Sequence, residues 1–216
     1  MCFSASASFA AGAVLTSVGA ASLHKTKKPS EIPFASIPLF FGLQQITEGF
    51  VWLSLTNPDY AFMEGISAHA FIFFAQVLWP FWVPFSIYKF EKQEGIKNIL
   101  GKVLVGIGVL IATVLAYFLF TQHIEAEILG HHVSYDQAYL QQFGVIGGIL
   151  YLAVIVIPPL ISSNRKMWIL GGAIFLAYIF TEIFYSQYVV SVWCFFAAIL
   201  SAMVLWIFFA KRKDSK

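Results

Sequence analysis

Long, continuous apolar runs separated by short polar segments dominate the hydrophobic pattern of this chain. Strands of a membrane barrel alternate between apolar and polar residues, whereas a helix crosses a hydrocarbon layer of about 30 Å with roughly 20 apolar residues. The pattern therefore predicts an all-α fold, a bundle of seven transmembrane helices in one membrane domain of residues 1–216. The predicted spans are 3–23, 34–55, 66–85, 103–120, 143–161, 167–185 and 188–209.

The boundary between the last two spans has no Gly or Pro to mark it. As one helix, Met167–Phe209 would be about 65 Å long at 1.5 Å per residue, twice the thickness of the hydrocarbon layer. We therefore predict a break at Ser186-Gln187. Within the third span, Pro80 and Pro84 each remove a backbone hydrogen bond, and we expect a kink there.

The composition excludes a water-soluble protein. Of the 216 residues, 59% are hydrophobic and only 11% are charged, whereas soluble domains carry about 25% charged residues. The high aromatic content also excludes a disordered chain. The lipid bilayer is thus the first expected partner.

The charged residues between the spans predict the orientation in the membrane. All thirteen Lys and Arg follow the first, third, fifth and seventh spans, on one side of the bundle. The loops on the other side carry only acids, namely Asp59, Glu64, Glu125, Glu127 and Asp136. Since basic loops stay in the cytoplasm, the amino terminus is predicted outside and the carboxyl terminus inside a cytoplasmic membrane. The net charge of +2 is this loop excess and predicts no nucleic-acid surface.

Polar side chains within the predicted spans are the candidate functional groups, because they are costly to place in lipid. Glu48, His69 and Glu182 all fall in the outer half of their spans. Groups at one depth are satisfied most easily by facing one another, so we expect an outward-facing polar pocket. The candidate ligand-binding residues are Gln44, Gln45, Glu48, Trp52, His69, Gln76, Glu182 and Trp193.

Three functions are compatible with this pocket. The first is transport or binding of a small polar solute, a proton or a cation, with Glu48 and Glu182 holding the charge. The second is a membrane-embedded enzyme with Cys2, His69 and Glu48 as candidate catalytic residues, Cys2 acting as nucleophile and His69 or Glu48 as base. The third is a structural subunit in which the polar side chains only bond helices together.

A metal ion is the one cofactor for which the sequence offers ligands. Cys2, His69 and Cys194 would supply a thiolate and imidazole set, although they lie on separate spans and follow no motif spacing. In the longest outer loop, His123, Glu127 and His131 are spaced i, i+4, i+8 and would share a face if the loop were helical. Gly130 and His132 interrupt this pattern, so we expect a solvated acidic loop, with the helical zinc face as the alternative.

Two spans share a short internal sequence similarity. Thr47-Glu48-Gly49-Phe50 in the second span matches Thr181-Glu182-Ile183-Phe184 in the sixth at three positions of four. If spans 1–3 and 5–7 were parallel repeats joined by span 4, the two acids would be equivalent. That 3+1+3 arrangement is similar to the transporters built from triple-helix repeats.

Two motifs resemble an uncharacterised family of bacterial multi-pass membrane proteins. Its members open with MCFSA, as Met1–Ala5 does here, and carry GxQQxxEGxVW in the second span, where this chain has Gly42-Leu43-Gln44-Gln45-Ile46-Thr47-Glu48-Gly49-Phe50-Val51-Trp52. The resemblance implies a membrane location and a seven-helix layout. It implies no activity.

Overall fold

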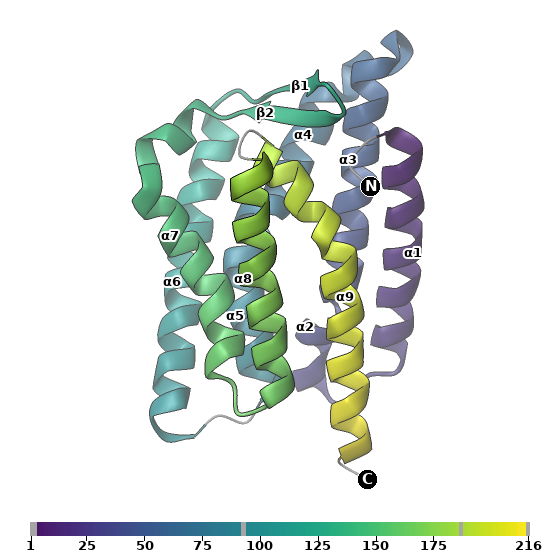
Figure 1. Cartoon of the computed structure of the whole chain (residues 1–216). Coiled ribbons are helices and arrows are strands. Elements are labelled where there is room, and N and C mark those ends of the chain that lie inside the picture. The colour runs from purple at the N-terminus through teal and green to yellow at the C-terminus, as the bar shows by residue number, and fades with distance from the viewer. Residues whose placement is uncertain (1–3, 92–93, 186–187, 215–216) are drawn as a thin grey trace.

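The computed structural model describes residues 4–91, 94–185 and 188–214. Its helices lie along one common long axis, and a β-hairpin covers one end of the bundle (Figure 1). The α-helices are α1 (Ala5–His24), α2 (Ile32–Ala35), α3 (Ile37–Thr56), α4 (Glu64–Ile72), α5 (Trp79–Phe90), α6 (Gly95–Thr121), α7 (Ala138–Ile161), α8 (Arg165–Tyr185) and α9 (Val189–Asp214). Two short 3-10 helices, η1 (Pro29–Glu31) and η2 (Pro58–Met63), and a π-helix, η3 (Phe73–Leu78), complete the helical part. The predicted helical fold class is confirmed.

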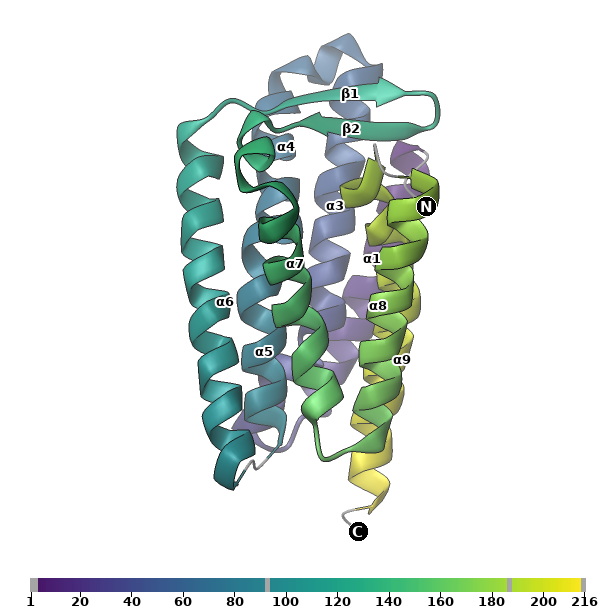
Figure 2. The same ribbon diagram turned by 60° about the vertical axis from the view of Figure 1, so that its left-hand side comes forward.

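Five helices among the described residues are long and apolar enough to cross a membrane. They are Ala5–His24, Pro58–Phe90, Gly95–Thr121, Phe143–Ile161 and Arg165–Tyr185. The predicted span 34–55 falls on α2 and α3, and the span 188–209 falls on α9. The predicted break at Ser186-Gln187 lies outside the described residues, between the end of α8 and the start of α9, which run side by side in opposite directions (Figure 2).

Helices α1 and α3 pack with their backbones in contact. A Cβ atom added at Gly19 would lie 2.4 Å from the backbone nitrogen of Leu39, and one added at Gly42 would lie 2.5 Å from that of Thr16. Small residues at a helix interface permit such an approach and replace the hydrophobic driving force that lipid does not supply. This pair of helices therefore forms one fixed side of the bundle.

The predicted kink near Pro80 takes the form of the π-helix η3. Pro80 is the second residue of α5 and cannot donate to the carbonyl of Gln76, so the turn before it departs from α-helical bonding. The carbonyl of Ala75, within η3, accepts a 2.5 Å hydrogen bond from the hydroxyl of Tyr151 on α7. A backbone irregularity in the middle of the bundle is thus satisfied by another helix, as a bilayer requires.

The segment predicted as a loop or as a metal-binding helix is instead a β-hairpin. Strands β1 (Glu125–Leu129) and β2 (His132–Asp136) pair antiparallel, with Glu125 opposite Asp136 and Leu129 opposite His132. Gly130 opens the turn at φ 65°, a conformation that glycine adopts without strain. Ala126 and Val133 are buried against the bundle, so alternation of apolar and polar residues explains the strands.

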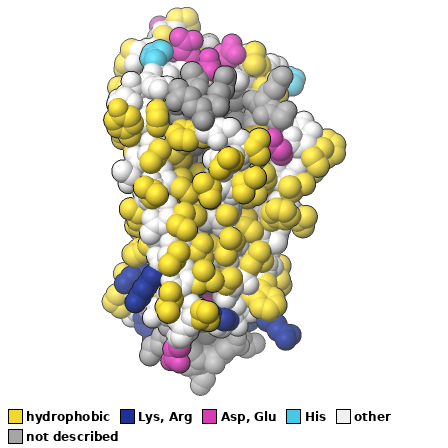
Figure 3. All heavy atoms as spheres, turned by 90° about the vertical axis from the view of Figure 1, so that its left-hand side faces the viewer, with side chains coloured by type: hydrophobic (Ala, Val, Ile, Leu, Met, Phe, Trp, Pro, Cys, Tyr) yellow, Lys and Arg dark blue, Asp and Glu magenta, His cyan; other side chains and the backbone are white. Residues whose placement is uncertain are grey.

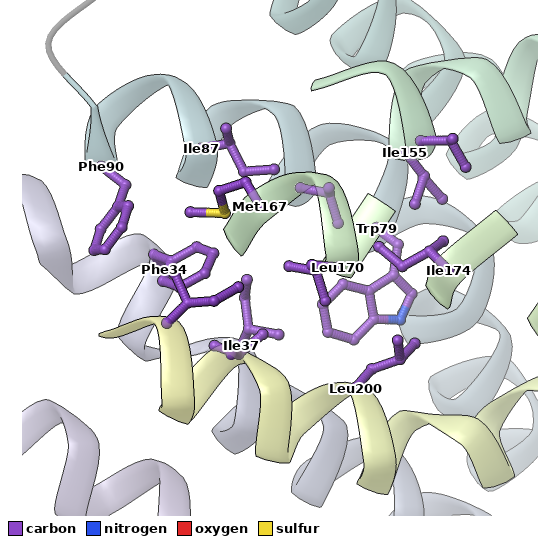
Figure 4. Close-up of a cluster of buried hydrophobic side chains, with 14 of the residues drawn as sticks. Phe34, Ile37, Trp79, Ile87, Phe90, Ile155, Met167, Leu170, Ile174 and Leu200 are labelled. Carbon is purple, nitrogen blue, oxygen red and sulfur yellow. The ribbon is translucent and has the colours of Figure 1, made fainter. Parts of the chain in front are cut away.

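The main apolar core lies toward the end of the bundle that carries the basic residues. Phe34 and Phe90 stack at 4.4 Å, and Met167 and Leu170 of α8 belong to the same cluster (Figure 4). Around the outside, apolar side chains cover the middle of the bundle on the face of α6 and α7. Lys and Arg gather near one end of that face, and a group of Asp and Glu lies at the other (Figure 3). This surface fits a lipid environment.

Candidate ligand-binding cavity

A cavity of about 510 Å³ lies inside the bundle. Its walls come from α2, α3, η3, α5, α6, α7, α8 and α9. Most wall residues are aliphatic or aromatic, among them Phe41, Trp79, Ile155, Ile174 and Leu200. Several of these also belong to the core cluster of Figure 4, so the cavity continues the apolar core.

Few polar side chains reach this wall, and those of Gln44, Gln76 and Tyr151 are held by hydrogen bonds. The indole Nε1 of Trp79 donates to Gln44 Oε1 over 2.9 Å, and Gln76 Nε2 donates to Gln137 Oε1 over 2.5 Å. Tyr151 donates to the backbone of η3, as described above. The cavity is therefore apolar, with a small number of fixed polar groups.

Three amphipathic rings lie together on one part of the wall. Trp193 of α9 lies between Tyr151 of α7 and Tyr178 of α8, with ring centroids 6.2 Å and 5.5 Å apart and both pairs edge to face. We call these residues the aromatic trio. Glu182 lies one helical turn from Tyr178 along α8. The trio gives the cavity polar edges on an apolar surface.

Glu48 lies outside the cavity wall, in a separate buried position between α3 and α9. Its side chain has no exposure and accepts hydrogen bonds from Gln45 Nε2 at 3.1 Å and from Ser191 Oγ at 2.8 Å. Two polar atoms on the same face of α3, Gln45 Oε1 and Trp52 Nε1, are buried with no hydrogen-bond partner among the described residues. Buried polar atoms of this kind are commonly satisfied by ordered water.

His69 lies in a different depression, between α4 and the end of α6. Its Nδ1 is 2.7 Å from the carbonyl oxygen of Gly65 on the same helix, and the depression also contains His123 and several phenylalanines. Glu182 is exposed on α8. The expectation that Glu48, His69 and Glu182 share one pocket is therefore wrong. Sequence spacing gives the depth of each group, but the rotation of each helix about its axis is set by packing.

Of the predicted ligand-binding residues, the structure brings Gln44, Gln76 and Trp193 together in the cavity wall. Gln45, Glu48 and Trp52 lie on the neighbouring face of α3. Glu48 is buried whereas Glu182 is exposed, so the two acids matched by the internal sequence similarity do not have equivalent surroundings. Tyr151, Tyr178 and Trp79 were not singled out, since aromatic residues in an apolar span resemble ordinary core. Trp79 and Tyr151 carry hydrogen bonds that only the structure reveals.

The cysteines cannot be placed in a site. Cys2 lies outside the described residues, and so does the side chain of Cys194. Among the described residues, no group of three or more His, Cys, Asp or Glu side chains is placed to hold a metal ion. The helical alternative for His123, Glu127 and His131 is excluded, because Glu127 is in a β-strand.

Comparison with known proteins identifies one family. A family model described as "Family of unknown function (DUF6629)" matches residues 1–216. No curated protein and no solved structure matches the chain. The match agrees with the resemblance of the sequence to an uncharacterised family, and the cavity is the feature from which a function must be argued.

Proposed function

Because the chain belongs to DUF6629, a family whose function is unknown, we propose its function from the cavity: the protein binds a small amphipathic, lipid-soluble molecule inside the membrane. One observation carries the proposal. The cavity of about 510 Å³ falls within the size of typical ligand sites, and its wall is mainly apolar with a few fixed amide, hydroxyl and indole groups. Such a wall matches a molecule with an apolar body and one polar group.

The chemistry of the wall narrows the range of ligands. A hydrated ion or sugar would lose its water shell in this cavity and find few replacements, at a cost of several kcal/mol for each unsatisfied polar group. A quinone, an isoprenoid or a fatty acid would instead gain from burial of its apolar part. Gln76 and the aromatic trio lie where the polar group of such a molecule would make hydrogen bonds.

The same proposal includes the membrane arrangement. Seven spans would be formed by α1, α2 with α3, α4 through α5, α6, α7, α8 and α9, with the amino terminus outside the cytoplasmic membrane. In support, basic residues lie at the helix ends that this arrangement assigns to the cytoplasm: Lys25 directly after α1, Lys89 in α5, Lys97 and Lys102 in α6, and Arg165 in α8.

A second candidate function is carriage of a proton or a cation by Glu48. The observation that favours it is a fully buried carboxyl group, 0% exposed, beside Gln45 Oε1 and Trp52 Nε1, which have no hydrogen-bond partner in the part of the chain that the structure describes. Ionisable groups inside a membrane are costly and mark ion or proton pathways. If this candidate is correct, Glu48→Gln abolishes proton or cation movement in proteoliposomes and leaves binding in the cavity intact.

The binding proposal is tested with cis-parinaric acid, a fatty acid whose fluorescence rises in apolar sites. Purified protein in nanodiscs is expected to bind it saturably. Ile174→Trp, which fills the cavity, should weaken binding, whereas the matched control Ile169→Trp, on the exposed face of the same helix, should not. Absence of saturable binding, or equal binding by the two variants, would overturn the proposal.

A further inference from the structure

The cavity reaches the outer surface of the bundle between α6 and α7. Leu110 of α6 and Leu150 of α7 both line the cavity, yet they are 64% and 49% exposed. A side chain that faces both the interior and the surroundings marks an opening in the wall. Both residues lie near the middle of their helices, and Figure 1 shows α6 and α7 as neighbours at the left of the bundle.

Glycines of α7 keep this opening free of side chains. Gly144 and Gly148 line the cavity, and a Cβ atom added at either would meet no atom within 4 Å. Gly108 on α6 is the contrast, because a Cβ atom there would lie 2.1 Å from the carbonyl oxygen of Pro80. Close helix packing thus explains Gly108 but not Gly144 or Gly148. Gly144 also interrupts α7 with φ 52°, so the helix is bent beside the opening.

The surroundings of the opening are apolar along the membrane depth. Residues 103–120 of α6 and 143–161 of α7 contain no Asp, Glu, Lys or Arg. Val145 and Ile146, next to the glycines, are 78% and 73% exposed, as expected of side chains in lipid. An ion or a hydrated solute would find no charged side chain in these segments to replace its water.

We infer that the cavity is loaded sideways from the bilayer, through a portal between α6 and α7 bordered by Leu110, Gly144, Gly148 and Leu150. This inference rests on the proposed function and specifies its substrate class: a membrane-dissolved molecule with an apolar chain that never passes through water. Tyr151 adjoins Leu150 in the sequence and lines the cavity, so a chain entering here passes directly to the aromatic trio.

The portal is tested by blocking it from each helix. Gly148→Trp and Leu110→Trp place an indole at the opening, and Gly106→Trp is the matched control. Gly106 is exposed on α6, is not part of the described cavity wall, and has no atom within 4 Å of an added Cβ. Stopped-flow fluorescence measures association of cis-parinaric acid with protein reconstituted in phosphatidylcholine vesicles, and protein-free vesicles give the signal of probe dissolved in lipid alone.

Both portal variants are expected to slow association by about tenfold or more, with dissociation slowed in parallel, because a steric step is added to binding and release. The Gly106→Trp variant should bind at the wild-type rate. Wild-type rates in both portal variants, or weaker affinity at an unchanged association rate, would overturn the portal while the binding proposal stands. Absence of binding to the wild-type protein would overturn both.

Discussion

Trp79 of α5 and Gln44 of α3 are joined by a hydrogen bond of 2.9 Å from the indole Nε1 to the amide Oε1. Both side chains are buried, and the ring of Phe41 stacks on the indole with centroids 4.0 Å apart. The side-chain amide of Gln44, a predicted ligand contact, therefore also holds the Trp79 ring in place in the cavity wall. Loss of this amide should affect both stability and the shape of the site.

Gln44→Leu is expected to destabilise the protein by about 1–3 kcal/mol, because it leaves the buried Trp79 N–H without its acceptor. Trp79→Phe removes the donor, so the double variant should lose less stability than the sum of the single variants. Calorimetric unfolding of the four proteins in the same detergent measures this coupling. Strictly additive losses would show that the hydrogen bond contributes nothing.

Replacement of Glu48 is expected to depend on the hydrogen-bonding capacity of the new side chain. Glu48→Leu removes the acceptor for both Gln45 Nε2 and Ser191 Oγ and should cost about 1–3 kcal/mol of stability. Glu48→Gln keeps one acceptor oxygen and should cost less. Glu182→Leu is the matched control, since Glu182 is exposed and its replacement should have a small effect. Thermal unfolding measures the melting temperatures of the three variants. A larger drop for Glu182→Leu than for Glu48→Leu would refute the prediction.

The helices were predictable because their apolar runs are long and a bilayer permits few other structures. That the segment Met167–Phe209 forms two helices, α8 and α9, also followed from length alone. The hairpin at Glu125–Asp136 was missed, although Ala126 and Ile128 alternate with acids, because an acidic segment outside the membrane needs no regular structure. A short alternating pattern gives a weak signal beside twenty continuous apolar residues.

The site was predictable only in part, for a geometric reason. The identity and depth of Gln44, Gln76 and Trp193 follow from the sequence, and the structure places all three in one wall. The direction in which a side chain points depends on helix rotation, and the sequence does not fix that angle for residues such as His69. The cavity is an unfilled space between helices. Its presence depends on how all of them pack together, so it cannot be predicted from any single residue.

Gly19→Ala is expected to destabilise the contact between α1 and α3 by about 1–3 kcal/mol, because the new methyl group would overlap the backbone of Leu39. The matched control is Gly106→Ala on α6, where the methyl group would enter open space. That control should be neutral or gain at most about 1 kcal/mol, since alanine favours helix over glycine. Denaturant titration of the two variants tests the contrast, and equal effects would contradict it.

His132 makes the attachment of the hairpin sensitive to pH. Its ring lies 4.8 Å from that of Tyr188 and 5.5 Å from that of Tyr185, so the first residue of β2 packs against the last residue of α8 and the residue before α9. Burial, and next the neighbouring His131, lower the pKa of His132 below its ordinary value of 6.5. As the pH falls below about 6.5, the unfolded chain takes up a proton on His132 more readily than the folded protein does. Stability from His132 is therefore complete at neutral pH, falls as the pH drops through about 6.5, and levels off below the folded pKa.

His132→Phe should keep the aromatic packing and remove this part of the pH dependence. The melting temperature of the wild-type protein is expected to fall between pH 7.5 and pH 5, and that of His132→Phe to fall less. His123→Phe is the control, because His123 is exposed at the start of the hairpin, where its Nε2 is 3.9 Å from Glu125, and its loss should leave the wild-type drop. Scanning fluorimetry at both pH values measures the three melting temperatures. An unchanged drop in His132→Phe would mean that other groups cause the acid sensitivity.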